Sequence, residues 1–277
     1  MIKGEDMKNF VKACVVCAML IMSPVTIWAS QTLEVDDAAT EGYGNFLYEI
    51  NGDHIRNKDL YFGSEKVNNI FTAGTSEHTE LSLEVPYLML SPSTVTGKYE
   101  HGLGDMRFKF KQQVNENEVK QALAYELYAD LPTGDKKIGL GTRNVVWGGK
   151  LIDTQECHDN AIHLNLGYEI LGRDIKKMHF AEDFAVLYGV VLEHKFTESF
   201  RLLGELKGER RKEAREVTET DIETGIEAAQ GYSHPLTFMT GAIYDVTKSW
   251  YVDLGWRTGL NRDAEGQEVL VGTAWRF

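Results

Sequence analysis

The chain has 277 residues, with 29 Lys and Arg against 42 Asp and Glu, which gives a formal net charge of −13. An acidic balance of this size excludes a generic nucleic-acid binder, for which a basic surface is expected. Two of its three cysteines lie in the first 17 residues, within an apolar leader. Only one cysteine lies beyond the leader, which excludes a framework of disulfides within the rest of the chain.

The first 29 residues have the three-part pattern of a secretory signal peptide. A short basic start at Met7–Lys12 is followed by the apolar run Ala13–Ile27 and a small-residue exit at Ala29. The apolar run falls short of the roughly 20 residues that an uncleaved membrane anchor needs. No small-residue box precedes either cysteine of the run, which argues against a lipoprotein signal. We expect cleavage near Ala29 or Ser30.

The predicted domain organisation follows from this leader. Residues 1–29 form the signal peptide, and translation from Met7 would make residues 1–6 an artefact of the assigned start. Residues 30–277 contain no Pro/Ser-rich linker and no shift in composition, so we expect one domain. No later apolar stretch is long enough for a membrane helix. Any membrane insertion must therefore use strands.

From residue 42 onward, segments of about ten residues alternate between apolar and polar side chains. In Ser82–Leu90, for example, Leu83, Val85, Tyr87 and Met89 share one face. This period of two is typical of strands that face lipid on one side and a lumen on the other. We predict twelve such strands, in chain order residues 42–50, 60–74, 80–90, 102–113, 119–131, 143–152, 161–171, 183–195, 199–210, 236–246, 250–260 and 267–277.

The last predicted strand ends on Trp275 and Phe277, as outer-membrane barrels usually do, because a terminal aromatic sits at the girdle where the barrel closes. A water-soluble sandwich also produces alternation, but its strands are usually five or six residues long. The predicted fold class is therefore all-β, a transmembrane antiparallel up-and-down β-barrel of 12 strands. In lipid only such closure pairs every backbone group.

This fold predicts a location and partners. We expect the barrel to lie in the outer membrane of a Gram-negative cell, in contact with lipid and lipopolysaccharide. The C-terminal strand with Trp275 and Phe277 is the expected recognition element for the barrel-assembly machinery. An even strand number places the short joints in the periplasm, including the one beside Cys157, whose thiol we interpret as incidental. The long connection Arg211–Pro235 would then lie outside the cell. Within it, Val217–Ala229 would form either part of an outer loop or extensions of the strands above the membrane.

Four short motifs carry a resemblance to a known family, and the ordered pair of the first two is the most specific. Gly102–Asp105 reads Gly-Leu-Gly-Asp and Leu131–Asp135 reads Leu-Pro-Thr-Gly-Asp; His163–Tyr168 and Gly259–Asn261 follow later. Together they resemble the outer-membrane transporter family of the meta-pathway of phenol degradation, from about Leu81 to Phe277. The resemblance implies a channel for small, often aromatic or hydrophobic, compounds and supplies no catalytic residues. The charged segment 205–235 departs from the family pattern.

The residues by themselves favour a structural role for the first two motifs. Glycine permits tight bending and Asp can accept hydrogen bonds from loop N–H groups. No helix follows the Gly-x-Gly, so it is not a dinucleotide fingerprint.

Alternation also predicts which charges point into the lumen. The candidates for a lumen constriction are Arg107, Lys109, Lys111, Glu126, Glu169, Arg201, Glu205, Asp253 and Arg257. A tight turn at Asn115–Asn117 would set Arg107 across from Glu126. These charges either pair with one another and fill a narrow barrel, or the basic row of Arg107, Lys109 and Lys111 faces acids elsewhere and creates a transverse field.

Two other classes of function compete with a channel. An enzyme would use His101, His179 or His234 in the outer loops, with Asp105 or Asp183 nearby, but no nucleophile motif accompanies them. An adhesion or structural barrel would use the charged run Glu209–Glu213 to bind a partner or lipopolysaccharide phosphates, although a solvated loop accounts for that run more simply. We therefore expect a non-enzymatic barrel without metal or cofactor.

Overall fold

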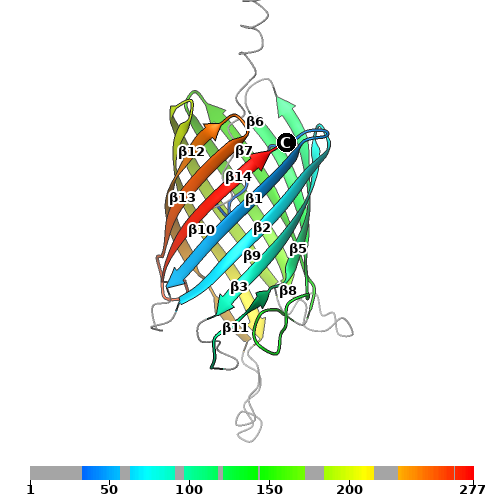
Figure 1. The fold of residues 1–277 in the computed structure, drawn as a ribbon, viewed down its shortest axis with the longest axis vertical. Helices are drawn as coiled ribbons and strands as arrows, with labels where there is room; N and C mark the ends of the chain where they lie inside the picture. The colour runs from blue at the N-terminus through cyan, green and yellow to red at the C-terminus, as the bar shows by residue number, and fades with distance from the viewer. Residues whose placement is uncertain are drawn as a thin grey trace, which may run out of the picture.

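The computed structural model describes residues 33–56, 63–90, 97–117, 121–142, 144–171, 184–214, 230–264 and 266–277. Within these ranges, twelve long antiparallel strands close into a tilted barrel (Figure 1). The wall strands are β1 (Phe46–Arg56), β2 (Gly63–Ser76), β3 (Thr79–Leu90), β5 (Met106–Asn117), β6 (Gln121–Leu131), β7 (Val146–Cys157), β8 (Asn160–Leu171), β9 (Phe184–Thr197), β10 (Phe200–Ala214), β12 (Leu236–Thr247), β13 (Trp250–Gly259) and β14 (Gln267–Arg276). No helix in the described part of the chain is long and apolar enough to cross a membrane.

Closure of the ring comes from the pairing of the first strand, β1, with the last, β14. Between them each wall strand pairs with the next along the chain, and β10 pairs with both β9 and β12. At the end of the chain Phe46 and Phe277 exchange two backbone hydrogen bonds, of 3.2 and 2.9 Å. The predicted all-β, 12-stranded antiparallel barrel is confirmed.

Alternation along the strands sorts the side chains between the two faces of the wall. On β14, Val269 and Val271 are 45% and 54% exposed on the outer surface, whereas Glu268 and Leu270 are buried in the lumen. Trp275 lies on the outer face between Tyr48 of β1 and Trp250 of β13, with ring centroids 6.1 and 6.3 Å away. This aromatic row matches a membrane girdle.

The two ends of the barrel differ in their connections. At the end where β14 terminates, two-residue joints link β2 to β3, β7 to β8, β9 to β10 and β12 to β13; we call this the turn end. The long connections lie at the opposite end, the loop end, which is the lower end in Figure 1. Cys157 is exposed at the turn end, beside His158 with its positive φ of 56°.

Several predicted strands have different bounds in the structure, and β1, β7 and β10 differ at ends that were expected to lie in loops. β1 does not begin at residue 42, because Gly42 and Gly44 adopt positive φ values of 75° and 78° and turn the chain. It runs on to Arg56, through residues expected in a loop. β7 likewise continues to Cys157 rather than ending at 152, and β10 continues to Ala214 rather than ending at 210.

Two short strands lie outside the ring of twelve. The predicted strand 102–113 is divided: β4 (Glu100–Leu103) pairs with β3 alone, and β5 takes over as the wall strand from Met106. The N–H of Gly104 donates to the carbonyl of Pro86 at this break, 2.9 Å away. β11 (Gln230–Ser233) pairs with the far end of β10, as a strand extension. The stretch Val217–Ala229, expected as an excursion or as strand extensions, lies outside the described residues.

The first two family motifs pack against each other at the loop end. The Asp105 carboxylate accepts hydrogen bonds from the N–H of Gly134 (2.9 Å) and from the N–H and hydroxyl of Thr142 (2.6 and 2.7 Å). The Thr133 hydroxyl accepts from the N–H of Met106 at 3.0 Å. A Cβ on Gly134 would lie 2.3 Å from the Leu140 carbonyl oxygen, so only glycine fits. The motifs form one structural joint.

Candidate functional site

The residues before β1 lie inside the barrel. Leu33–Glu41, which we call the lumen segment, runs from the interior to the turn end; Val35 and Ala38 are only 2% and 0% exposed. The sequence pattern placed the start of the barrel domain at residue 30 and did not predict that residues 33–41 lie inside the barrel. Nine residues are too few for a pattern that distinguishes a lumen segment from a wall strand. The wall itself begins at Phe46.

The part of the lumen segment farthest from the turn end is held by charges on β10 and β13. Glu34 forms ion pairs with Arg257 Nη1, at 2.7 Å, and with Lys207. The backbone N–H groups of Glu34 and Val35 both donate to Glu205 Oε2, at 2.8 and 3.0 Å. One wall carboxylate thus binds the segment's backbone while neighbouring cations bind its side chain.

The middle of the lumen segment is held by β7 and β8. The N–H of Asp36 donates to Asn165 Oδ1 at 2.9 Å, and Asn165 Nδ2 donates back to the Asp36 carbonyl at 2.8 Å. The Asp36 carboxylate forms an ion pair with Lys150, which also contacts Glu126 at 3.0 Å. Burial alone would raise the pKa of Asp36, but Lys150, together with Lys109 and Lys111, holds it well below its usual range.

Contacts near the turn end complete the docking. The N–H of Ala38 donates to Thr154 Oγ1 at 2.9 Å, and the N–H of Glu41 donates to Glu80 Oε2 at 2.8 Å. The Glu41 carboxylate is 3.5 Å from Arg276 Nε. Burial raises the pKa of Glu41 to about 7, despite the opposing effect of Arg276.

On one side of the lumen, apolar side chains are interspersed with buried charged ones. Leu33 and Val35 pack there into a buried cluster whose wall members come from β1, β9, β10 and β12–β14: Leu47, Val191, Leu203, Met239, Ile243, Tyr251, Leu270 and Ala274. Gly189 of β9 lies directly under Val35, because a Cβ at Gly189 would be 2.3 Å from Val35 Cγ2. We call this surface the apolar strip.

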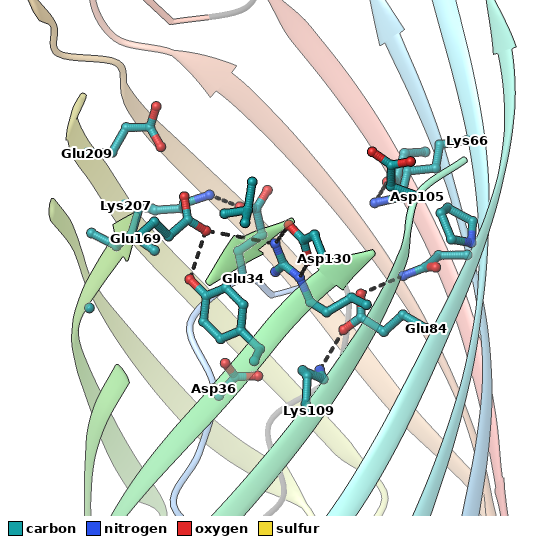
Figure 2. Close-up of a pocket in the computed structure, with 18 of the residues that line it drawn as sticks. Glu34, Asp36, Lys66, Glu84, Asp105, Lys109, Asp130, Glu169, Lys207 and Glu209 are labelled. Atoms are coloured by element: carbon teal, nitrogen blue, oxygen red, sulfur yellow. Dashed lines mark hydrogen bonds and ion pairs between the residues drawn. The ribbon is translucent and has the colours of Figure 1, made fainter. Parts of the chain in front are cut away.

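The predicted basic row lies on β5, with each cation next to an acid. Lys109 contacts Glu84 at 2.6 Å, a pair visible in Figure 2. Lys111 contacts Glu80 at 2.9 Å and the lumen segment's Asp37 at 4.0 Å. Both lysine side chains are nearly inaccessible to solvent.

Arg107, the third cation of the row, is not opposite Glu126 as the sequence suggested. Its guanidinium makes a bidentate ion pair with Asp130, at 2.5 and 2.9 Å, and Asp130 is its register partner. Glu126 is the register partner of Lys111 instead. The β5–β6 ladder extends to Asn117 and Gln121 and contains a register shift after Gln113, so the predicted turn was too early.

The remaining candidate residues lie at several levels of the lumen. Glu169 accepts a hydrogen bond from the Tyr128 hydroxyl at 2.8 Å and is 3.8 Å from Arg107. Arg201 lies near the turn end, 3.2 Å from Asp245 and 3.5 Å from Glu193. Asp253 is buried beside Gly272, where a Cβ would be 2.5 Å from its oxygens. The structure therefore distributes these residues along the lumen instead of gathering them in one ring.

A cavity of about 690 Å³ occupies the lumen on the loop-end side of the lumen segment. Leu33, Glu34, Val35 and Asp36 of the segment contribute to its lining. Around it stand charged side chains of the wall, as the labelled residues of Figure 2 show. The wall lining includes Asp53, Lys66, Glu84, Arg107, Lys109, Tyr128, Asp130, Lys150, Glu169, Lys207, Glu209, Arg211 and Arg257.

The residues considered for an enzyme have other partners. His101 Nδ1 is hydrogen-bonded to the Tyr87 hydroxyl at 2.8 Å, and the His234 ring stacks on Tyr232. The Asp105 carboxylate accepts hydrogen bonds from the N–H groups of Gly134 and Thr142. His179 and Asp183 lie outside the described residues. Among those described, no group of three His, Cys, Asp or Glu side chains suits a metal ion.

Solved structures share this fold. An outer membrane channel from Pseudomonas putida F1 is 13% identical, with a TM-score of 0.68 over 88% of this chain and 100% of that one. The NanC porin is 5% identical, with a TM-score of 0.57 over 82% of this chain and 98% of that one. No curated protein matches the sequence. A family model described as "Putative MetA-pathway of phenol degradation" matches residues 68–277, most of the chain, and the protein therefore belongs to that family.

Proposed function

We propose that this protein is an outer-membrane channel for small solutes, with the lumen segment as the element that closes its path. The observation that carries the proposal is the lumen cavity of about 690 Å³, which ends on Leu33–Asp36. Membership of the phenol-degradation family and the fold shared with a channel and a porin support it. Twelve strands enclose more space than the roughly eight whose interior side chains can fill.

The cellular placement is part of the proposal. The turn end faces the periplasm and the loop end faces the exterior, because outer-membrane barrels have short periplasmic turns and longer outer loops. Cleavage of the signal near Ala29 or Ser30 would leave the mature N-terminus only a few residues before Leu33.

The two sides of the lumen favour a class of solute. The apolar strip lies across the interior from cations of β5 and β7, and Leu33 and Val35 cover it. Withdrawal of the segment would expose apolar side chains next to Glu205 and Arg257 and opposite the paired charges of β5 and β7. Small molecules with an aromatic or aliphatic body and one polar group would match both surfaces. We infer a non-enzymatic role, since the lumen supplies binding surfaces and a barrier.

Single-channel conductance of the refolded chain tests the proposal. Glu34→Gln with Asp36→Asn removes two charges that anchor the segment, so the double variant should open more often or to a larger conductance than the natural sequence. Glu65→Gln is the control, because Glu65 pairs with His54 at an exposed site. A heat-modifiable, folded barrel that stayed silent in both forms, with and without small aromatic solutes, would contradict a channel.

A further inference from the structure

Strand geometry sorts the charged run near the loop end of β10 by face. Glu209 and Arg211 turn inward, where Arg211 contacts Glu209 at 3.0 Å and Glu169 at 3.8 Å. Arg210 is exposed on the outer face, with its guanidinium carbon 5.0 Å from the centroid of the Tyr232 ring. Lys212 is the register partner of Tyr232, so it shares that outer face. The outward part of this run is therefore cationic.

The outer face of β10 changes character along its length. Leu202, near the turn end, and Leu206, in the middle of the strand, are exposed apolar residues. At Gly208 the ring of Tyr188 crosses the strand, because a Cβ on Gly208 would lie 2.5 Å from that ring. Arg210 follows, about 7 Å farther along the strand. Apolar, aromatic and cationic side chains in this order match hydrocarbon, aromatic girdle and headgroups.

Neighbouring strands continue the aromatic level beneath the cations. Val186 and Phe184 of β9 are the register partners of Arg210 and Lys212. The Phe184 ring stacks on Tyr168 of β8 at 5.6 Å. A lipid held at the two cations would thus rest its acyl chains on an apolar and aromatic wall. Arg binds phosphate with paired, charge-assisted hydrogen bonds, which suits a phosphorylated headgroup.

We propose that Arg210 and Lys212, backed by Tyr188 and Tyr232, form a binding site for the phosphate groups of lipid A, the membrane anchor of lipopolysaccharide. The site lies on the lipid-facing surface and is separate from the channel. It rests on the outer-membrane orientation proposed above, because lipopolysaccharide occupies the outer leaflet, beside the loop end. Binding there would hold a lipid molecule against β10 where β11 extends the sheet.

Lipid A binding to the refolded, detergent-solubilised full chain tests the site. Bisphosphorylated lipid A should bind, and dephosphorylated lipid A should bind much more weakly. Arg210→Gln with Lys212→Gln should weaken binding about 30-fold, since each cation near an anionic lipid surface contributes about a factor of five. Arg210→Lys with Lys212→Arg should restore most of it. Lys207→Gln with Arg211→Gln is the matched control, because it removes the same two positive charges from the lumen face of the same strand.

A specific lipid A site and a general charge effect give different outcomes. Equal loss in the Lys207→Gln, Arg211→Gln variant would show a non-specific charge effect and would overturn the proposal. Equal competition by phosphatidylglycerol vesicles or by inorganic phosphate would do the same, since the site would then not be one for lipid A. Channel conductance of the Arg210/Lys212 variant should match that of the natural chain, so a failed lipid site and a failed channel give different results.

Discussion

Arg257 binds Glu34 of the lumen segment and Glu268 of β14 through the same nitrogen, Nη1, at 2.7 Å each. One guanidinium therefore joins the segment to the wall, 223 residues away in sequence. Its other terminal nitrogen is 3.4 Å from Glu205, whose second oxygen holds the segment's backbone. The arrangement makes docking of the segment depend on a charge network of the wall.

Replacement of Arg257 should therefore release the lumen segment. Arg257→Gln leaves Glu34, Glu205 and Glu268 without a shared cation, and breaking a buried pair costs about 3–5 kcal/mol. We expect a lower unfolding midpoint in urea and a higher open probability in planar bilayers. Lys66→Gln is the control, since Lys66 contacts Asp53 only at 3.9 Å and is more exposed. Equal behaviour of the two variants would contradict a network that holds the segment.

Overpacking the apolar strip should displace the segment without touching a charge. Gly189→Leu places a side chain where Val35 lies, and forced overpacking costs about 1–3 kcal/mol. The segment can move more easily than the wall, so conductance should rise while heat-modifiability is retained. Gly204→Ala on β10 is the control, because the nearest atom to its added Cβ would be 3.9 Å away. A closed channel in the Gly189→Leu variant would place the barrier elsewhere.

The basic row should influence which ions pass. Lys109→Gln with Lys111→Gln removes two lumen cations and leaves Glu84 and Glu80 uncompensated, so the preference for cations over anions should increase. Reversal potentials under a salt gradient measure the change. Gln is the better test than Glu, because a new carboxylate would lie beside an existing one and disturb assembly. Unchanged selectivity in a folded variant would assign these lysines a packing role only.

Docking of the segment should weaken as pH rises through about 7. The pKa of Glu41 is raised above its ordinary value by burial in the docked state. Proton binding therefore favours the docked state, and this contribution is lost at higher pH. The charged groups around Glu41 are Arg276, Glu80, Lys111 and Asp37.

Open probability measured between pH 6 and 8 checks this expectation. It should increase with pH in the natural chain, and Glu41→Gln should remove most of the dependence. A Glu77→Gln control should keep it, because the Glu77 side chain lies at an exposed joint of the turn end. A pH dependence that survived in the Glu41→Gln variant would assign the titration to another group.

The sequence alone was sufficient to predict the wall of the barrel. Alternation over ten or more residues sets the face of each side chain, because successive residues of a strand point to opposite sides. The lumen face of β13, with Asp253 and Arg257, was therefore predicted from spacing alone, and Leu254 and Trp256 are exposed on its opposite face. The terminal Phe277 likewise marked the closing strand.

Which charges pair with one another depended on the tertiary structure. The pairing of Arg107 with Asp130 rather than Glu126 results from a register shift and a later turn, which strand periodicity does not encode. Docking of Leu33–Glu41 depends on contacts with Lys150, Glu205 and Arg257, which lie more than 100 residues away in sequence. Such contacts exist only after the barrel has closed, so local pattern could establish which charges face the lumen, while three-dimensional closure decided which of them hold the segment.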